Sequence, residues 1–540
     1  MVSAVLFITF FVLLVLNVPI SVCLGLSSAA AILYSGTSLT IVATNIYSGI
    51  SKFLLLAIPF FVLSGNIMAK AGISTRLIRF VDTCVGHRKG GIANVCIIVA
   101  CFFGAISGSG PATVAALGAV LIPAMVERGG FSAAFSTALM ATSSSIAIVI
   151  PPSIAFVVYA SITGVSIGDM FMAGIIPGIL MGLALVVVVM LEVRRNHVVP
   201  STVEKASAKE RWNAFKDAFW GFLMPVIILG GIYGGIFTPT EAAAVSVVYG
   251  LFVGMIIYKE VKFKDLWEIL IDSAKTTGGI MLIVACASLF SFVCTRFGIS
   301  TAASELLARV AGNQFTFLLI CNIIFLIAGC FIDANSAMYI FIPIMLPVCK
   351  ALGYNVIAFG IMATVNLAIG QVTPPVGVNL FVAIGIKLRD GIRVTLQEIS
   401  RAVVPMVAAS IVVLLIITYI PQISTCLPAA LGSAAAIENG ETAGGDSGTT
   451  QTDNDDFNTI GDYSDLDWAD MTWNFTCSTT ETSTWAQAGR KFGELMEQAT
   501  GGKVKVDVYA ADQLTGGNQS EGIQALMNGD PVQISMHSNL

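Results

Sequence analysis

Residues 91–126 read GIANVCIIVACFFGAISGSGPATVAALGAVLIPAMV, an apolar stretch interrupted near its centre by Ser107-Gly-Ser-Gly110-Pro. One helix that crosses a bilayer needs about 20 apolar residues, so this stretch exceeds one span. Glycine allows a tight turn, and proline ends a helix because it lacks an N–H donor. The sequence therefore predicts two short helical arms joined at a polar tip, which is a re-entrant hairpin.

Three other apolar stretches are interrupted in the same manner. Residues 315–349 carry Asp333-Ala-Asn335-Ser336 at their centre and predict a second hairpin. Residues 132–160 and 356–386 are each long enough for one span, but Ser, Thr and the pairs Pro151-Pro152 and Pro374-Pro375 break them. Each predicted hairpin is thus followed by a predicted broken span.

The composition indicates a membrane protein. Of 540 residues, 56% are apolar and only 11% are charged, and the mean hydropathy is +0.85. Soluble domains carry about 25% charged residues, so most of the chain is neither a soluble enzyme, nor a nucleic-acid binder, nor disordered. The net charge of −5 is an average, because Ser433–Asp470 is rich in Asp and Glu and has no Lys or Arg. With three His in the chain, a zinc site or a His-based catalytic site has little material.

We expect ten spans plus two re-entrant hairpins, with the N-terminus outside the cell. The uninterrupted spans fall near 3–19, 20–35, 53–69, 171–191, 218–236, 242–258, 277–294 and 402–420. This layout places the loops at 70–90, 127–130, 192–217, 259–275 and 387–401 in the cytoplasm, and most loop Lys and Arg residues lie in them. The positive-inside rule supports the layout, which leaves both termini extracytoplasmic.

The layout contains a repeat. Residues 1–192 give three spans, a hairpin, a broken span and a last span, and residues 218–420 give the same order from the opposite side. Matched interrupted helices in an inverted repeat indicate a transport site. Residues 193–217 are expected to form a linker helix on the cytoplasmic surface, with a solvated linker as the alternative.

The interruptions predict the site chemistry. Unwound carbonyls and hydroxyls suit a hard cation such as Na⁺, and half-helix N-termini suit an anion. Close packing and helix kinks are the alternative interpretation. Asp333 is expected to bind a cation, to carry a proton or to cap a helix. Arg296 is expected either to pair with a substrate carboxylate or to extend to the membrane interface. Glu241, in the Thr238-Pro-Thr-Glu turn, is expected to cap the following span.

The chain resembles the large membrane subunit of tripartite ATP-independent periplasmic (TRAP) transporters over residues 1–420. The segments that carry the resemblance are SGSGPATVAALGAVLIPAM at 107–125, IPPSI at 150–154, TPTEAAA at 238–244, DANSAMYIFIPIMLPV at 333–348 and IGQVTPPVGVNLF at 369–381. The resemblance implies an all-α polytopic membrane protein with an ion-transporter-superfamily fold of the elevator type. It also implies Na⁺-driven transport of an organic acid of the C4-dicarboxylate or sugar-acid class.

The resemblance also implies residue roles. One Na⁺ site would include the first hairpin tip and the first break, at Ser107, Gly108, Ser109, Gly110, Ser144 and Ser145. The other would include Asp333, Asn335, Gly370 and Thr373. Substrate-side polar residues would be Ser109, Ser153, Arg296 and Asp333.

The C-terminal part differs in composition. Residues 421–470 predict an acidic flexible linker. Beyond it, Trp473-Asn-Phe-Thr and Lys503–Tyr509 predict strands, and Thr484–Gly501 and Ser520–Met527 predict helices. This order, with QLTGGNQSEGIQALMNGD at 513–530, resembles the first lobe of the TRAP substrate-binding protein. Residues 471–540 are too few for two lobes, so we expect a truncated α/β fragment of that protein.

We therefore expect the permease subunit of a Na⁺-coupled importer in the bacterial inner membrane, not an enzyme. Its expected partners are a separate small four-span membrane subunit, a fused or separate binding domain, an organic anion and the lipid bilayer. Na⁺ is the expected coupling ion, and no cofactor or nucleic acid is expected. A proton-coupled carrier or antiporter that needs no binding protein is the main alternative. A sensor would require a cytoplasmic signalling module, and an intramembrane enzyme would require a catalytic constellation, which the sequence lacks.

Overall fold

The computed structural model describes residues 2–16, 18–195, 205–386, 394–431, 471–477, 484–500, 503–509 and 534–536. The chain divides into two compact units, residues 1–442 and 443–540. Every described element of the first unit is helical, as the sequence predicts. The expected linker at 432–470, the expected helix at 520–527 and the 513–530 motif lie outside the described residues.

The first half of the first unit contains the predicted hairpin, broken helix and closing helix, and also the short helices α3 and α5, which were not predicted. Two short apolar helices and a membrane-length segment precede the hairpin, and a long helix closes the half. The elements are α1 (Val2–Val15), α2 (Ile20–Tyr34), α3 (Thr40–Ile50), η1 (Phe53–Leu56), α4 (Ala57–Lys70), α5 (Ile73–Val85), α6 (Gly91–Ser107), α7 (Gly110–Glu127), α8 (Ala133–Ser145), η2 (Ile146–Ile148), α9 (Ile154–Thr163) and α10 (Ile167–Arg195). The first hairpin is α6–α7, and the first broken helix is α8, η2 and α9.

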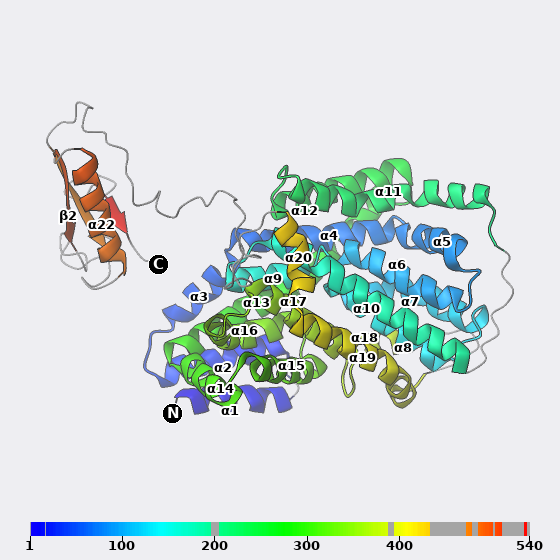
Figure 1. Cartoon of the computed structure of the whole chain (residues 1–540), viewed down its shortest axis with the longest axis horizontal. Coiled ribbons are helices and arrows are strands. Elements are labelled where there is room, and N and C mark those ends of the chain that lie inside the picture. Colours follow the sequence, from blue (N-terminus) through cyan, green and yellow to red (C-terminus); the bar gives the residue numbers. More distant parts are fainter. Residues whose placement is uncertain are drawn as a thin grey trace, which may run out of the picture. The chain divides into compact units, whose positions relative to one another are not determined.

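The second half also contains a helical hairpin, a broken helix and a closing helix, and the inverted repeat stays a prediction. Its elements are α11 (Ala208–Tyr233), α12 (Pro239–Leu251), η3 (Phe252–Ile257), α13 (Phe263–Arg296), α14 (Ile299–Ala311), α15 (Gln314–Phe331), α16 (Ala334–Ala351), α17 (Val356–Gly370), α18 (Val378–Ile384), α19 (Leu396–Tyr419) and α20 (Gln422–Ala430). The second hairpin is α15–α16, and the second broken helix is α17 and α18. Figure 1 shows the two closing helices, α10 and α19, next to each other, and they are in contact.

Several segments expected as loops or linkers are helical. α5 lies within the loop expected at 70–90, where Ile73, Leu77 and Val81 are buried on one face. The first turns of α13 lie in the loop expected at 259–275. A linker helix was expected at 193–217; residues 208–217 are instead the start of the continuous helix α11, and residues 196–204 lie outside the described residues. α20 occupies residues 422–430, where the linker was expected to begin, and packs on α10 and α17. These segments mix polar and apolar residues, so a search for long apolar runs misses them.

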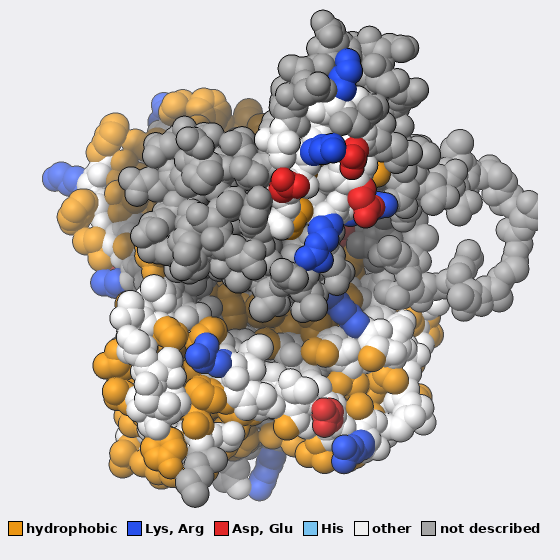
Figure 2. Space-filling model, turned by 90° about the vertical axis from the view of Figure 1, so that its left-hand side faces the viewer, with side chains coloured by type: hydrophobic (Ala, Val, Ile, Leu, Met, Phe, Trp, Pro, Cys, Tyr) orange, Lys and Arg blue, Asp and Glu red, His pale blue; other side chains and the backbone are white. Residues whose placement is uncertain are grey.

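Among the described residues, nine helical segments are long and apolar enough to cross a membrane. They include α7, α15 and α16, which are hairpin arms in the expected layout. Helix length therefore does not distinguish a hairpin arm from a helix that crosses the membrane, and the count of ten spans stays a prediction. The surface is consistent with a bilayer: Phe11, Tyr47 and Val248 are among many exposed hydrophobic side chains. Figure 2 shows one face, on which such side chains are numerous over the described helices.

The predicted hairpins and broken helices interlock across the two halves. α8 packs on both arms of its own hairpin, α6 and α7, and α17 packs on α15 of its own hairpin. The second pieces of the broken helices cross over: α9 packs against α16, and α18 packs against α7 and α8. Each hairpin therefore contacts a piece of both broken helices.

The second unit contains a small parallel sheet. β1 (Met471–Cys477) lies between β2 (Val504–Tyr509) and β3 (Ile534–Met536) and is parallel to both, with Met471 opposite Val504 and Phe475 opposite Ile534. α22 (Thr484–Ala499) connects β1 to β2 and packs against β2 (Figure 1). The strands expected near 473–476 and 503–509 and the helix expected at 484–501 are confirmed.

Candidate functional site

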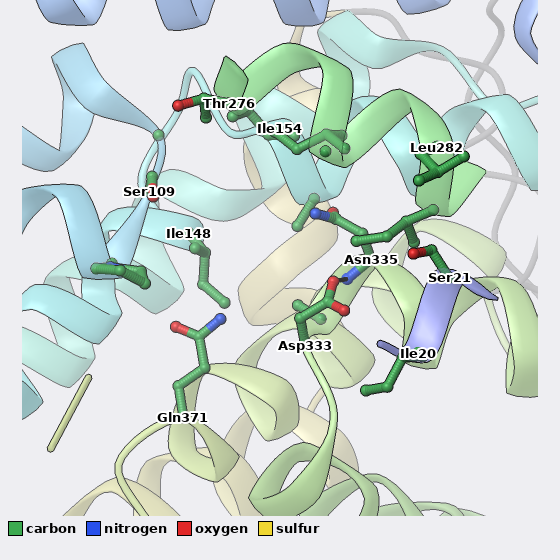
Figure 3. Close-up of a pocket in the computed structure, with 18 of the residues that line it drawn as sticks. Ile20, Ser21, Ser109, Ile148, Ile154, Thr276, Leu282, Asp333, Asn335 and Gln371 are labelled. Atoms are coloured by element: carbon green, nitrogen blue, oxygen red, sulfur yellow. Dashed lines mark hydrogen bonds between the residues drawn. The ribbon is translucent and has the colours of Figure 1, made fainter. Parts of the chain in front are cut away.

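The two hairpin tips border one cavity of about 550 Å³. Gly108, Ser109 and Gly110 line it from the first tip, and Asp333 and Asn335 line it from the second. Ser21 of α2 and Thr276 of α13 lie on the remaining wall. Figure 3 shows Ser109 on one side of the pocket and Asp333 with Asn335 on another. The structure thus brings together five of the residues predicted for the ion and substrate sites.

The first tip is held by hydroxyl groups. Gly108 has a φ of 59°, which favours glycine, and ends α6. The Oγ of Ser107 lies 2.8 Å from Oγ1 of Thr113, which donates to the carbonyl of Ser109 at 2.8 Å. Ser109 precedes α7 and makes no side-chain capping bond. The tip therefore presents neutral oxygen atoms and carries no charged side chain.

The second tip is held by a carboxylate. Oδ2 of Asp333 accepts hydrogen bonds from the backbone N–H groups of Asn335 and Ser336 at 3.0 and 3.1 Å, and Oδ1 accepts from the Ser336 hydroxyl at 2.5 Å. Asp333 is thus the N-cap of α16, as one of its three interpretations predicted. Its roles as a cation ligand or proton carrier stay predictions. Oδ1 of Asn335 is buried without a hydrogen-bond partner among the described residues.

The first break positions buried hydroxyls. Ser144 and Ser145 are fully buried, and their hydroxyls donate to the carbonyls of Ala141 and Thr142 at 2.7 and 2.8 Å. Ser153 is also fully buried, and its hydroxyl donates across the break to the carbonyl of Ile148 at 2.6 Å. These three residues lie beside the cavity rather than on its lining.

The second break packs closely against its hairpin. A methyl group at Gly370 would lie 2.5 Å from backbone atoms of Gly329. Helices α15 and α17 can therefore approach this closely only because both residues are glycines. The hydroxyl of Thr373 donates to the carbonyl of Ile369 at 2.7 Å. Gly370 and Thr373 adjoin Gln371, which does line the cavity.

Helix termini give the cavity its electrostatic character. The first residues of α7, α9 and α16, which are Gly110, Ile154 and Ala334, all line it. Helix N-termini carry a partial positive charge and free N–H groups, so they attract an anion. α8 and α17 instead end at the breaks with their partially negative C-termini. The helix termini thus give the cavity a partial charge that suits an anion and the breaks a partial charge that suits a cation.

The structure places Lys275, not Arg296, at the cavity. Lys275 lines the cavity from α13, although it was expected in a cytoplasmic loop, and its Nζ lies 3.6 Å from Asp272. Arg296, expected on the substrate side, is exposed at the end of α13 with its guanidinium 6.0 Å from the Phe292 ring centroid. It is not among the cavity-lining residues. Glu241 accepts hydrogen bonds from the N–H and hydroxyl of Thr238, which confirms its predicted capping role.

Two further polar residues lie at the site without having been predicted there. Gln371 lines the cavity, and Figure 3 shows its side chain near Ile148. Asn379 is fully buried at the start of α18, and its Nδ2 lies 3.5 Å from the Ser144 hydroxyl. Both occur in the 369–381 segment, but only the three-dimensional structure shows that they reach the first hairpin.

Comparisons with known proteins agree with this architecture. A family model described as "Tripartite ATP-independent periplasmic transporter, DctM component" matches residues 7–423, and one described as "Bacterial extracellular solute-binding protein, family 7" matches residues 475–540. The C4-dicarboxylate TRAP transporter large permease protein DctM of Rhodobacter capsulatus is 38% identical over 436 residues, covering 78% of this chain and 97% of that protein.

Two further comparisons concern a relative and a solved structure. The isethionate TRAP transporter permease protein DctMQ of Oleidesulfovibrio alaskensis is 40% identical over 420 residues, covering 78% of this chain and 65% of that protein. The crystal structure of the Alcanivorax borkumensis YdaH transporter aligns with a TM-score of 0.52 at 15% identity, covering 72% of this chain and 88% of that one. This second likeness concerns the fold alone.

Proposed function

Because the chain belongs to the DctM family of TRAP transporter large permeases and carries a DctP-like segment at residues 475–540, we propose that it is the permease subunit of an organic-anion importer. The family and the apolar helices make it a multi-pass inner-membrane protein. In this proposal a Na⁺ gradient drives uptake, and the cargo belongs to the C4-dicarboxylate or sugar-acid class. A binding domain delivers the cargo outside the cell, where both termini lie, and a small four-span membrane subunit completes the transporter.

The cavity between the hairpin tips carries this proposal. Three helix N-termini and Lys275 border it, and the Asp333 carboxylate is already engaged by three hydrogen-bond donors. These features favour an anionic cargo. The relatives support the same class, because one is named for a C4-dicarboxylate and another for isethionate.

An elevator mechanism is the second part of the proposal. The hairpins and broken helices pack on one another through α7 with α18 and α9 with α16, which favours their movement as one body. α2 and α13 form the opposite wall of the cavity and belong to the scaffold in this mechanism. Movement of the inner body against α13 would carry the cavity across the membrane.

Reconstituted transport tests the function. The full chain, with the small membrane subunit and a complete binding protein, is placed in proteoliposomes, and uptake of labelled organic acids is followed. Internal and external Na⁺, K⁺ and pH are varied independently at constant ionic strength. We expect uptake only with an inward Na⁺ gradient and with the binding protein, because cargo delivery and ion coupling are both required.

The alternative makes the opposite prediction. A proton-coupled carrier would transport along a pH gradient without Na⁺, and a proton ionophore would abolish its uptake. Uptake that persists without the binding protein would also favour this alternative. Protein-free liposomes and liposomes with the binding protein alone serve as controls.

A further inference from the structure

Two side-chain oxygens beside the first hairpin are buried without partners. Gln371 is 6% exposed and Asn379 is 0% exposed. Neither Oε1 of Gln371 nor Oδ1 of Asn379 has a hydrogen-bond partner among the described residues. Buried polar atoms are nearly always satisfied, so two orphaned oxygens at one place indicate a missing ligand.

Both oxygens converge on Gly110, the first residue of α7. A methyl group at Gly110 would lie 2.8 Å from Oε1 of Gln371, and 2.8 and 3.0 Å from Nδ2 and Oδ1 of Asn379. Glycine therefore lets the two amides reach the first hairpin tip. The Asn379 amide nitrogen also makes long contacts to the Ala141 carbonyl at 3.4 Å and the Ser144 hydroxyl at 3.5 Å. The pair thus lies between the first tip and the end of α8.

The chemistry of this position favours a cation. Side-chain amide oxygens, hydroxyls and backbone carbonyls are hard ligands that suit small cations such as Na⁺. Gly110 is the N-terminus of α7, whose partial positive charge opposes a cation. Against it, α8 ends at Ser145 and α17 ends at Gly370, and each places a partially negative helix C-terminus at its break. The atoms without partners are both oxygens, which accept hydrogen bonds but do not donate them, so they match a cation rather than an anion.

We propose that Gln371 and Asn379 are cation ligands that the second half of the chain contributes to the Na⁺ site of the first hairpin. This inference rests on the proposed Na⁺ coupling and adds two side chains that the predicted ion sites lack. The first site is then composite, because Ser107, Ser109 and Ser144 come from one half and the two amides from the other.

The composite site has a consequence for the second ion site. Gln371 lies between Gly370 and Thr373, which are predicted for that second site, and its backbone carbonyl accepts from the Asn379 N–H at 3.1 Å. An ion that holds the Gln371 side chain would also fix the backbone of the second break. Na⁺ binding at the first site therefore prepares the second, which is positive cooperativity.

The test measures Na⁺ binding without transport. The full chain is purified in detergent, and its thermal unfolding midpoint is followed as NaCl replaces choline chloride at constant ionic strength. A ligand that binds the folded state raises the midpoint, and the titration gives a half-saturating Na⁺ concentration. We expect Gln371→Met and Asn379→Leu, which keep size but remove the oxygen, each to raise that concentration by about tenfold or more. The Hill coefficient should fall toward one.

Matched controls separate ligand loss from loss of packing. Asn322 is 2% exposed, but its amide oxygen accepts from Asn366 at 2.6 Å, so Asn322→Leu should lower the midpoint without changing Na⁺ half-saturation. Gln397→Met alters an exposed glutamine of α19 and should change neither quantity.

The possible outcomes distinguish the two proposals. If wild-type protein responds to Na⁺ and both variants keep its half-saturation, the composite site is wrong and the Na⁺-coupled function stands. If wild-type protein shows no difference between Na⁺ and choline, the Na⁺ coupling itself is overturned, and this site with it.

Discussion

The two hairpins have the same architecture but different chemistry at their tips. The first tip is closed by neutral hydroxyls, with Ser107 bonded to Thr113, whereas the second is closed by the Asp333 carboxylate, which caps α16. Each is followed by a break that packs on the hairpins of both halves. The two hairpins therefore share an arrangement of helices, while their side chains give the two tips different electrostatic properties.

The largest effect is expected where a hairpin meets its break. Gly370→Ala would place a methyl group 2.5 Å from the Gly329 backbone, and Gly104→Ala in the first half would place one 2.7 Å from the Ala147 Cα. Such overpacking costs about 1–3 kcal/mol or more, so both variants should lose folded protein and Gly370→Ala should lose more. Detergent extraction followed by size-exclusion chromatography and thermal unfolding measures the loss. Gly230→Ala is the control, because a methyl group there would meet no atom within 4 Å. Equal yield and thermal stability of all three variants would refute the close contact.

The second tip can be tested by separating its charge from its capping role. Asn, Ser and Asp cap helices about equally well, so Asp333→Asn and Asp333→Ser should keep α16 intact, whereas Asp333→Ala should cost about 1 kcal/mol of stability. We expect all three to abolish Na⁺-driven uptake in proteoliposomes, because each removes the charge. Wild-type uptake by the Asn and Ser variants would restrict Asp333 to capping.

The first tip should respond more gradually. Ser107→Ala removes one neutral oxygen and the bond to Thr113 but no charge. We expect the Na⁺ concentration for half-maximal uptake to rise by about tenfold, while maximal uptake remains. Ser48→Ala, at an exposed position of α3, is the control. Complete loss of uptake at saturating Na⁺ would show that the two tips do not differ as proposed.

The smallest effect is expected at the wall that faces both tips. The Lys275 side chain is 73% exposed, so its interaction with a cargo carboxylate is worth about 1 kcal/mol or less. Lys275→Gln should therefore raise the half-saturating cargo concentration by up to about fivefold without changing the half-saturating Na⁺ concentration. Lys275→Arg keeps the charge, so its half-saturating cargo concentration should equal that of the wild type. Lys264→Gln, farther along α13, should behave as wild type. If Lys275→Gln also raises the half-saturating Na⁺ concentration, Lys275 does not act specifically on the cargo.

The tips and breaks could be predicted from sequence because Gly, Ser, Asp and paired Pro are rare inside apolar stretches. Gly108, Ser109, Gly110, Asp333 and Asn335 were predicted on that basis and meet at one cavity. α3 and α14 were not predicted, because each is short and mixes polar with apolar residues. Span hydrophobicity alone does not detect such helices.

Contacts between residues far apart in the chain could not be predicted from sequence patterns. Asn379 and Ser144 are 235 residues apart and meet only because α18 crosses to the first hairpin. Arg296 was predicted either to pair a substrate carboxylate or to reach the membrane interface, and it does not line the cavity, which leaves the second alternative. Lys275 was expected in a loop because the predicted span began near residue 277, but α13 runs from Phe263 to Arg296 and includes it.

The length of α13 has a further consequence for the surrounding lipid. Its 34 residues extend about 51 Å at 1.5 Å per residue, whereas the hydrocarbon core is about 30 Å thick. The helix must tilt strongly or project from the core, and its first turns expose both Phe263 and Trp267 beside charged residues, as an interfacial segment does. The wall of the cavity is thus a helix whose tilt depends on bilayer thickness. Acyl-chain length in reconstituted vesicles should therefore set the transport rate.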